Sequence, residues 1–258
     1  MSRSAERAHA ARRTVIEAAL AARTAHIGSS LSIVDVLAVL YSDVLTGDDR
    51  FLLSKGHAAS ALYATLAEHG ELDRDEVISG YCADGGEFAG HPERGVAGIE
   101  MTGGSLGHGP AIAVGTALAD RHDGAGRTYC LVGDGELNEG SVWEAIALAG
   151  HHGLANLTVI VDANGLQGLG RTGEVLDLEP LMPKLTSFGW HVSEVDGHDH
   201  DALRRVLPYQ PSLKPHAVIA RTTKGFGVSF MENELMWHYK SLRPEQRDEV
   251  LADLEATA

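Results

Sequence analysis

The stretch RTYCLVGDGELNEGSVWEAIALAGHHGLANLTVIVDA, residues 127–163, places a helical segment between two continuous apolar runs. The runs at 127–132 and 157–163 predict strands, and the segment at 138–153 predicts a helix that Gly153 closes. The same pattern predicts further short strands at 50–54, 190–195 and 216–222. Continuous apolar runs that alternate with helices are typical of a parallel sheet covered on both faces. We therefore predict an α/β fold, a doubly wound parallel sheet with helices on both faces.

The remaining periodic segments predict helices around that sheet. They cover 4–24, 30–45, 57–70, 111–122, 178–189, 201–207 and 244–256. Residues 80–109 break the pattern and hold ten of the chain's 30 glycines. A long irregular stretch is usually functional or disordered, and the lack of charge and Ser/Pro repeats here favours a binding loop. No linker or internal repeat divides the sequence, which predicts one domain over residues 1–258.

Composition narrows the class of partner. The chain of 258 residues carries a formal net charge of −15, which would repel the phosphate backbone of a nucleic acid. The two cysteines, Cys82 and Cys130, form no disulfide framework or metal-ligand spacing, as expected in a reducing compartment. The first residues do not resemble a signal peptide, and no apolar run approaches the ~18 residues of a membrane span. We expect a cytoplasmic protein without a membrane partner.

Polar groups follow two neighbouring strands of the predicted sheet. Asp134 lies between Gly133 and Gly135 after the first strand, and the second strand runs into Asp162 and Asn164. Ligands of open parallel sheets bind where strands end, and carboxylate and amide oxygens suit Mg²⁺ that bridges phosphates. The two glycines would let the metal and phosphate oxygens reach the backbone. A helix starting near residue 138 would point its first amides at the anion.

Two other interpretations of this motif remain open. Gly133-x-Gly135 begins a dinucleotide fingerprint, but Asn138 occupies the place of its third glycine, and Asp134 would repel a pyrophosphate. The motif is also compatible with a tight turn that has no ligand. A nucleotide-binding Mg²⁺ protein is disfavoured, because no P-loop lysine motif follows any glycine loop.

Further motifs identify a family. GDGELNEGSVWEA (133–145) followed by VIVDANGLQG (159–168) resembles the thiamine diphosphate fingerprint, in which Asn follows GDG after about thirty residues. Five more segments resemble transketolases in the same order: 26–41, LLSKGHAASALYATL (52–66), GHPE (90–93), GGSLGHG (103–109) and RTTKGFGVSFMENELMWH (221–238). The resemblance covers nearly the whole chain. The chain resembles the N-terminal, diphosphate-binding half of a transketolase, which is found as a separate subunit in split enzymes.

The resemblance implies a metal and cofactor site. Asp134, Asn164 and the backbone carbonyl of Leu166 match residues that coordinate Mg²⁺ or Ca²⁺ on the diphosphate of thiamine diphosphate. The segment Gly104, Ser105, Leu106 matches one that contacts the aminopyrimidine and the diphosphate. The same comparison puts further positions at the cofactor: His57, Gly133, Gly135 and Glu136.

The resemblance also implies catalytic residues. His26, His57, His91 and His238 match histidines that line the cofactor and substrate channel, where neutral imidazoles can give and accept protons near pH 7. Glu139 matches a glutamate in an acidic network that links paired active sites across a subunit interface. We expect structural or surface roles for nine other histidines: His9, His69, His122, His151, His152, His191, His198, His200 and His216.

The implied reaction is transfer of a two-carbon ketol unit from a ketose donor to an aldose acceptor, either of which is a sugar or a sugar phosphate. In the family, a glutamate on a second, pyrimidine-binding domain activates the cofactor, and 258 residues leave no room for that domain. We therefore expect a chain that is inactive alone and joins a C-terminal transketolase subunit in an α2β2 assembly. The alternatives are a subunit of another thiamine diphosphate enzyme, either 1-deoxyxylulose-phosphate synthase-like or a decarboxylase, and a non-catalytic pseudo-subunit.

Four departures from the family pattern bear on the substrate. Ala25 and Ser29 stand where relatives commonly have glycine around His26, and Gly103 replaces a common threonine. His108 replaces a usual glutamine, and Tyr239 follows His238 where glycine is frequent. These differences favour a specialised transketolase and do not identify its sugar.

Overall fold

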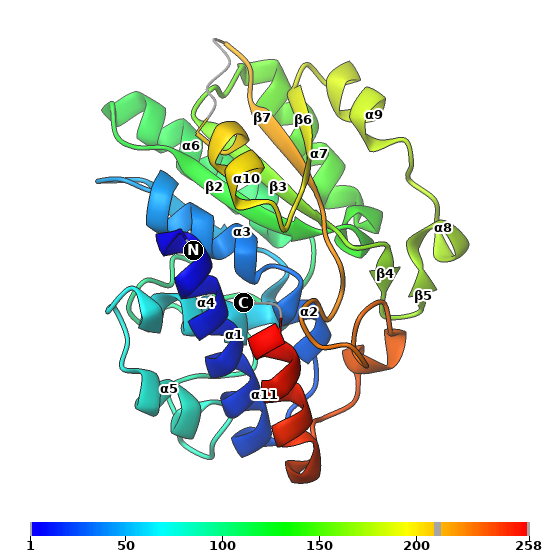
Figure 1. The fold of residues 1–258 in the computed structure, drawn as a ribbon. Helices are drawn as coiled ribbons and strands as arrows, with labels where there is room; N and C mark the ends of the chain where they lie inside the picture. Colours follow the sequence, from blue (N-terminus) through cyan, green and yellow to red (C-terminus); the bar gives the residue numbers. More distant parts are fainter. Residues whose placement is uncertain (1, 209–212, 257–258) are drawn as a thin grey trace.

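The computed structural model describes residues 2–208 and 213–256. Its centre is a parallel sheet of five strands in the order β1-β2-β3-β7-β6 (Figure 1). The strands are β1 (Arg50–Leu53), β2 (Thr128–Gly133), β3 (Leu157–Ala163), β6 (His191–Asp196) and β7 (His216–Arg221). Each lies within one residue of its predicted run, so the predicted parallel α/β sheet is confirmed.

Helices cover both faces of this sheet (Figure 1). One face carries α1 (Arg3–Ala22), α3 (Val34–Val39), α4 (Ala59–Glu68) and α10 (His200–Val206), and the other carries α6 (His108–Asp123), α7 (Gly140–His152) and α9 (Leu181–Ser187). Successive residues of a strand point to opposite faces. Ile160 therefore packs in the first core, and Val159 and Val161 pack in the second.

Shorter elements connect these layers. They are α2 (Ile27–Leu31), the π-helical turn η1 (Leu40–Val44), α5 (Arg74–Gly80), α8 (Thr172–Val175), α11 (Arg247–Ala256), the 3₁₀ turns η2 (Gly56–Ala58), η3 (Gly135–Asn138), η4 (Leu235–His238) and η5 (Pro244–Gln246), and a small hairpin of β4 (Leu166–Gln167) and β5 (Gly170–Arg171). No helix in residues 2–208 and 213–256 is both long enough and apolar enough to cross a membrane.

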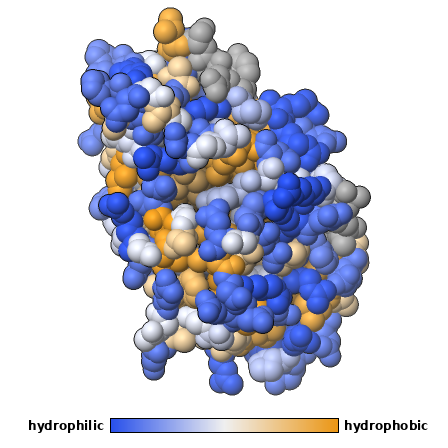
Figure 2. All heavy atoms as spheres, turned by 90° about the vertical axis from the view of Figure 1, so that its left-hand side faces the viewer, coloured by the Kyte–Doolittle hydropathy of each residue, from blue (hydrophilic) through white to orange (hydrophobic). Residues whose placement is uncertain are grey.

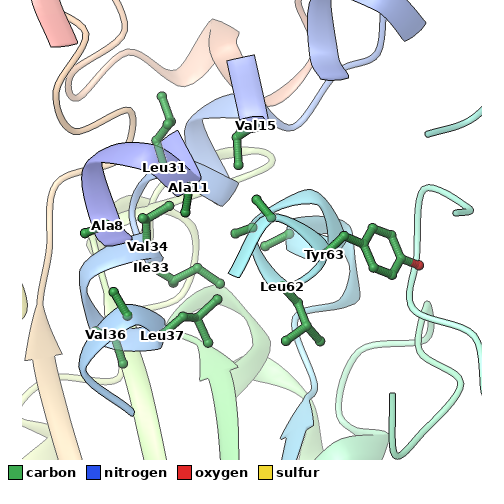
Figure 3. Packing of buried hydrophobic residues seen from close by; sticks show 14 of the residues in the cluster. Ala8, Ala11, Val15, Leu31, Ile33, Val34, Val36, Leu37, Leu62 and Tyr63 are labelled. Atoms are coloured by element: carbon green, nitrogen blue, oxygen red, sulfur yellow. The ribbon is translucent and has the colours of Figure 1, made fainter. Parts of the chain in front are cut away.

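The first core depends on small residues of α1. Ala8, Ala11 and Val15 form a stripe at i, i+3 and i+7 that is buried against α3 and α4 (Figure 3). Alanines at the contact let the helices approach closely, and Leu37 fills the space beside them. The same helix carries Arg12 into the interior, where only 7% of the residue is exposed.

The helix predicted over 30–45 is interrupted, which corrects that prediction. α2 ends at Leu31 and α3 begins at Val34, and the last turn is π-helical. The cause is Ser32, whose hydroxyl bonds the carbonyl of Ser29 at 2.9 Å and the carboxylate of Asp162 at 2.8 Å. A serine that bonds elsewhere competes with the helical pattern. The interruption turns this segment toward the end of β3.

The helix predicted to start near residue 138 begins at Gly140 instead, because the 3₁₀ turn η3 intervenes after β2. The amides nearest to the strand end therefore belong to η3. The glycine-rich stretch is irregular, as predicted, since neither helix nor strand occurs between Gly80 and His108. It is nevertheless held by specific bonds, such as Tyr63 Oη to the carbonyl of His91 at 3.1 Å.

Candidate active site

A cavity of about 300 Å³ opens where β2 and β3 end. Loops from the first core and from the glycine-rich stretch complete its walls. Its lining is His26, Ser29, Lys55, His57, His91, Gly104, Leu106, Gly133, Asp134, Gly135, Glu136, Asn164, Leu166, Gln167, Gly168, Lys224 and His238. The structure thus brings together the residues predicted for the site, with two exceptions. Ser105 and Glu139 lie outside the cavity and are exposed.

The carboxylate of Asp134 lies between the two strand ends. Neighbouring strands β2 and β3 pair Gly133 with Asp162, which brings the following turns together. The backbone N–H of Gly165 donates to Asp134 Oδ2 at 2.6 Å, and that of Gly135 donates to Oδ1 at 2.8 Å. Burial, and then the charge of Asp162, raise the pKa of Asp134 to about 6. A positive charge placed beside Asp134 would therefore favour the ionised form of its carboxylate.

The oxygen atoms around Asp134 fit a hard divalent cation. Asn164 donates its amide to Asp162 at 2.9 Å and accepts the N–H of Leu166 on Oδ1 at 3.0 Å, which fixes that oxygen at the cavity. In the part of the chain that the structure describes, no salt bridge engages Asp134, and no three His, Cys, Asp or Glu residues cluster as metal ligands. One carboxylate with neutral oxygens is the donor set that suits Mg²⁺ or Ca²⁺ better than softer metals.

Asp162 has a different role from Asp134. Its buried carboxylate forms an ion pair with Lys55 and accepts hydrogen bonds from Ser32 and Thr222. Burial opposes ionisation, but Lys55 and these hydrogen bonds outweigh it and hold the pKa of Asp162 below its ordinary value. Because its charge is already compensated and it does not line the cavity, Asp162 holds neighbouring residues in place and leaves Asp134 as the available acid.

Three imidazoles form a triangle in the cavity. The ring centroids of His26 and His238 lie 4.6 Å apart, those of His57 and His238 5.3 Å, and those of His26 and His57 5.4 Å. Burial is the main cause that lowers the pKa of each, to about 3 for His238 and well below the ordinary value for His57. The rings are therefore neutral at physiological pH and can act in proton transfer.

His26 is held in a strained backbone conformation. Its φ of 66° lies in the left-handed region, which is uncommon for a residue other than glycine. Its Nδ1 is buried and has no hydrogen-bond partner among the described residues. Strained backbone and unsatisfied polar atoms are often retained at functional sites. The strained backbone and the unsatisfied buried nitrogen mark His26 as a candidate functional residue.

Lys224 is a cavity residue that the sequence interpretation did not single out. Its ammonium is buried and contacts neutral groups, Ser29 Oγ at 2.9 Å and His238 Nδ1 at 3.3 Å. Burial, and then the charge of Lys55, lower its pKa to about 8. A lysine within the apolar, glycine-rich segment TKGFG was the signal that could have identified it. Lys55 is paired with Asp162, so Lys224 is the lysine that makes this wall of the cavity suitable for an anion.

A hydrogen-bonded cluster fixes the segment that carries Lys224. Buried Asp35 pairs with Arg12, and its carboxylate bonds His198 Nδ1 at 2.7 Å and His200 Nε2 at 2.9 Å. His198 Nε2 in turn accepts the N–H of Thr223 at 2.9 Å. These contacts agree with the structural role predicted for His198 and His200.

Glu136 holds the glycine-rich stretch against the end of β2. Its buried carboxylate accepts the N–H groups of Gly107 at 2.8 Å and Gly133 at 3.1 Å and the hydroxyl of Ser54. Burial raises its pKa. Glu136 thereby positions the segment that includes Gly104 and Leu106.

The fold and this cavity define a thiamine diphosphate-binding domain. Residues 4–254 match the family described as "Transketolase, thiamine diphosphate binding domain", so the chain belongs to the transketolase family. It is 41% identical to one of the subunits of an apulose-4-phosphate transketolase from Phocaeicola vulgatus, over 94% of this chain and 90% of that protein. It is 40% identical to the "6-deoxy-6-sulfo-D-fructose transketolase subunit SqwG" of a Clostridium strain over 89% of this chain and 88% of that protein.

A solved structure agrees with this assignment. "Transketolase from Leishmania mexicana" superposes on 99% of the chain with a TM-score of 0.91 and 32% sequence identity. The chain spans 42% of that transketolase. The predicted resemblance to the diphosphate-binding part of transketolases, and to the separate subunit of split enzymes, is confirmed.

Proposed function

We propose that the chain is the thiamine diphosphate- and Mg²⁺-dependent subunit of a two-chain enzyme that transfers a two-carbon ketol unit from a ketose to an aldose. The observation that carries this proposal is the meeting of Asp134 and Asn164 with three neutral histidines and buried Lys224 in one cavity. When bound, thiamine diphosphate would supply the carbon nucleophile and the electron sink for this transfer.

Charged and polar residues of the chain would have separate roles in holding the cofactor. Asp134, Asn164 and the carbonyl of Leu166 would hold Mg²⁺ on the diphosphate. Lys224 would offset the remaining negative charge, since its ammonium lies in the cavity without a carboxylate partner in the described chain.

The histidines would handle protons and the substrate. His26, His57, His91 and His238 line the cavity, and the first, second and fourth have lowered pKa values, so each of these three rings can accept or return a hydroxyl proton. His26 would meet a substrate hydroxyl through the part of its ring that lines the cavity. The exposed Glu139 would belong to a contact between paired sites at a subunit interface, as the resemblance implies.

A partner chain is part of the proposal. The names of both split relatives describe them as subunits, and the cavity lining formed by the described residues includes no glutamate from a pyrimidine-binding domain. We place that domain on a C-terminal transketolase subunit in an α2β2 assembly in the cytoplasm. Figure 2 shows a mainly hydrophilic face with hydrophobic side chains gathered in a band across its middle. This face is the left-hand side of Figure 1, whereas the β4-β5 hairpin beside the cavity lies on the right-hand side, so the band is on a different face from the cavity.

The substrate is proposed to be an anionic ketose of specialised metabolism. The names of the two relatives include a 4-phosphate and a 6-sulfo group, both of which are acidic. The four departures around His26, Gly103, His108 and His238 agree with a sugar outside the central pentose phosphate route.

The first test is purification from the native source in buffer with thiamine diphosphate and Mg²⁺, followed by mass spectrometry of the chains that co-elute. A stoichiometric partner with a pyrimidine-binding domain is expected. The purified complex should then transfer a ketol unit between sugar phosphates, and the same complex with Asp134→Ala should not. A complex that binds the cofactor and transfers nothing from any ketose would overturn the proposal in favour of a pseudo-subunit.

A further inference from the structure

Tyr239 connects two segments at the edge of the cavity. Its hydroxyl donates to the carbonyl of Gly168 at 2.6 Å, across 71 positions of sequence. Gly168 lines the cavity and forms the turn between β4 and β5. The tyrosine ring lies edge-on to His238, with the centroids 5.0 Å apart, and 54% of the residue is exposed. Tyr239 therefore lies at the surface beside one histidine of the triangle.

The absence of a side chain at Gly168 leaves room for this contact. A Cβ atom at this position would lie 2.9 Å from Tyr239 Oη and 3.5 Å from His238 Nε2. A side chain at 168 would push the tyrosine hydroxyl off the carbonyl or displace the hairpin. The glycine lets the hairpin turn close against both rings, so Gly168 and Tyr239 form a matched pair.

The other side of the hairpin is held independently. Gln167 Nε2 donates to Asn138 Oδ1 at 3.0 Å, and Leu166 N–H donates to Asn164 Oδ1 at 3.0 Å. A Cβ at Gly135 would lie 2.5 Å from Gln167 Cβ, so the hairpin also packs closely against η3. The hairpin thus spans from the strand ends to the turn that carries His238, and Tyr239 provides its hydrogen bond on the histidine side.

We infer that Tyr239 is a specificity-determining residue that limits the length of the aldose acceptor able to reach His238. This inference rests on the proposed function. A tyrosine ring is large and rigid, and its hydrogen bond to Gly168 fixes it beside His238. Tyr239 is not itself a cavity-lining residue, but its ring stands beside two that are, His238 and Gly168. An acceptor long enough to extend from His238 past the Gly168 turn would have to displace the ring and break this bond, whereas a short aldehyde would not reach it. Glycine, frequent at this position in the family, would leave the same side of the cavity open.

The test uses the complex of this chain with its partner and a fixed ketol donor. The acceptors are glycolaldehyde, with two carbons, and ribose 5-phosphate, with five. Tyr239→Gly should raise the ratio of kcat/KM for the long acceptor over the short one by about tenfold, within the range that pocket contacts provide. Tyr239→Phe keeps the ring without its bond and should raise the ratio less. The control is Lys240→Ala. Lys240 follows Tyr239 in the sequence, is exposed and lines a different pocket, so its replacement should leave the acceptor ratio unchanged.

A second readout does not depend on activity. In the full chain, amide hydrogen exchange of residues 166–171 should be faster in Tyr239→Phe than in the wild type, because the hairpin loses its bond on the histidine side. A wild-type exchange rate together with an unchanged acceptor ratio in Tyr239→Gly would overturn the inference. A wild-type complex that transfers no ketol unit to either acceptor would overturn the proposed function, and with it the substrate role of Tyr239.

Discussion

The backbone amide of Gly165 donates to the Asp134 carboxylate at 2.6 Å, so the turn after β3 is fixed to the acid that ends β2. This bond holds together the turns that follow the two neighbouring strands. Asp134, Asn164 and Leu166 all line the cavity, and this bond links the turns that carry them.

Asp134→Ala should abolish Mg²⁺-dependent binding of thiamine diphosphate in the assembled complex. We expect a loss of at least about 100-fold, because even residues that only orient metal ligands are worth 10- to 100-fold. Asn164→Ala should act in the same direction. Isothermal titration calorimetry measures the affinity, and circular dichroism should show an intact fold. Asp177→Ala, which removes an exposed carboxylate from the neighbouring cavity, is the matched control. Wild-type affinity in Asp134→Ala would refute the metal assignment.

His26→Ala and His238→Ala should lower turnover more than they weaken cofactor binding. The expected loss in kcat is about 10² to 10⁴, the usual contribution of positioned acid–base groups. His26→Asn keeps a residue that tolerates the left-handed backbone at this position, which separates loss of the ring from loss of the turn. His151→Ala, on the exposed side of α7, is the control. If steady-state kinetics show full turnover in both His26 and His238 variants, the channel assignment is wrong.

Lys224→Met should weaken the binding of inorganic diphosphate with Mg²⁺ by about 10- to 100-fold, the value of a charged hydrogen bond. The same variant should be at least as stable as the wild type without ligand, because it removes a buried ammonium that faces the charge of Lys55. Calorimetry and urea unfolding measure the two quantities. Lys240→Met replaces an exposed lysine that lies outside this cavity and should change neither quantity. Unchanged diphosphate affinity in Lys224→Met would contradict the anion-binding role.

Acidification should destabilise the protein partly through His216. Burial is the main cause that lowers its pKa from 6.5 to about 4, and the charges of His191 and Arg127 add to it. The unfolded chain therefore takes up this proton first, and stability falls as the pH drops from 6.5 toward 4. The full contribution is about 3 kcal/mol. Urea midpoints at pH 7 and pH 5 should differ less in His216→Gln than in the wild type. An equal difference would show that His216 does not contribute to the acid sensitivity.

Local patterns were sufficient for the strands of the sheet. Continuous apolar runs placed β2 and β3 within one residue, because burial on both faces leaves few alternatives. The residues of the GDG and Asn motif also met as expected, since neighbouring parallel strands end at one edge of the sheet. The single domain over 1–258 and the role of Glu139 stay predictions.

Long-range contacts were beyond a local pattern. The break in the helix predicted over 30–45 depends on Ser32, whose partner Asp162 lies 130 positions away. The importance of Lys224 depends on Ser29, which lies 195 positions away. Neither partner can be recognised until the chain has folded; the TKGFG segment marks Lys224 as unusual but does not give its contacts.

The histidine triangle has a consequence for biosynthesis. Its rings come from residues 26, 57 and 238, so the triangle cannot form on the ribosome until most of the chain has emerged. Contacts between such distant residues have high loop-closure cost and tend to form late in folding. Nascent chains arrested before residue 238 would expose the lysine-lined wall without its histidine cover. We therefore expect the reaction centre to be among the last regions to mature during synthesis.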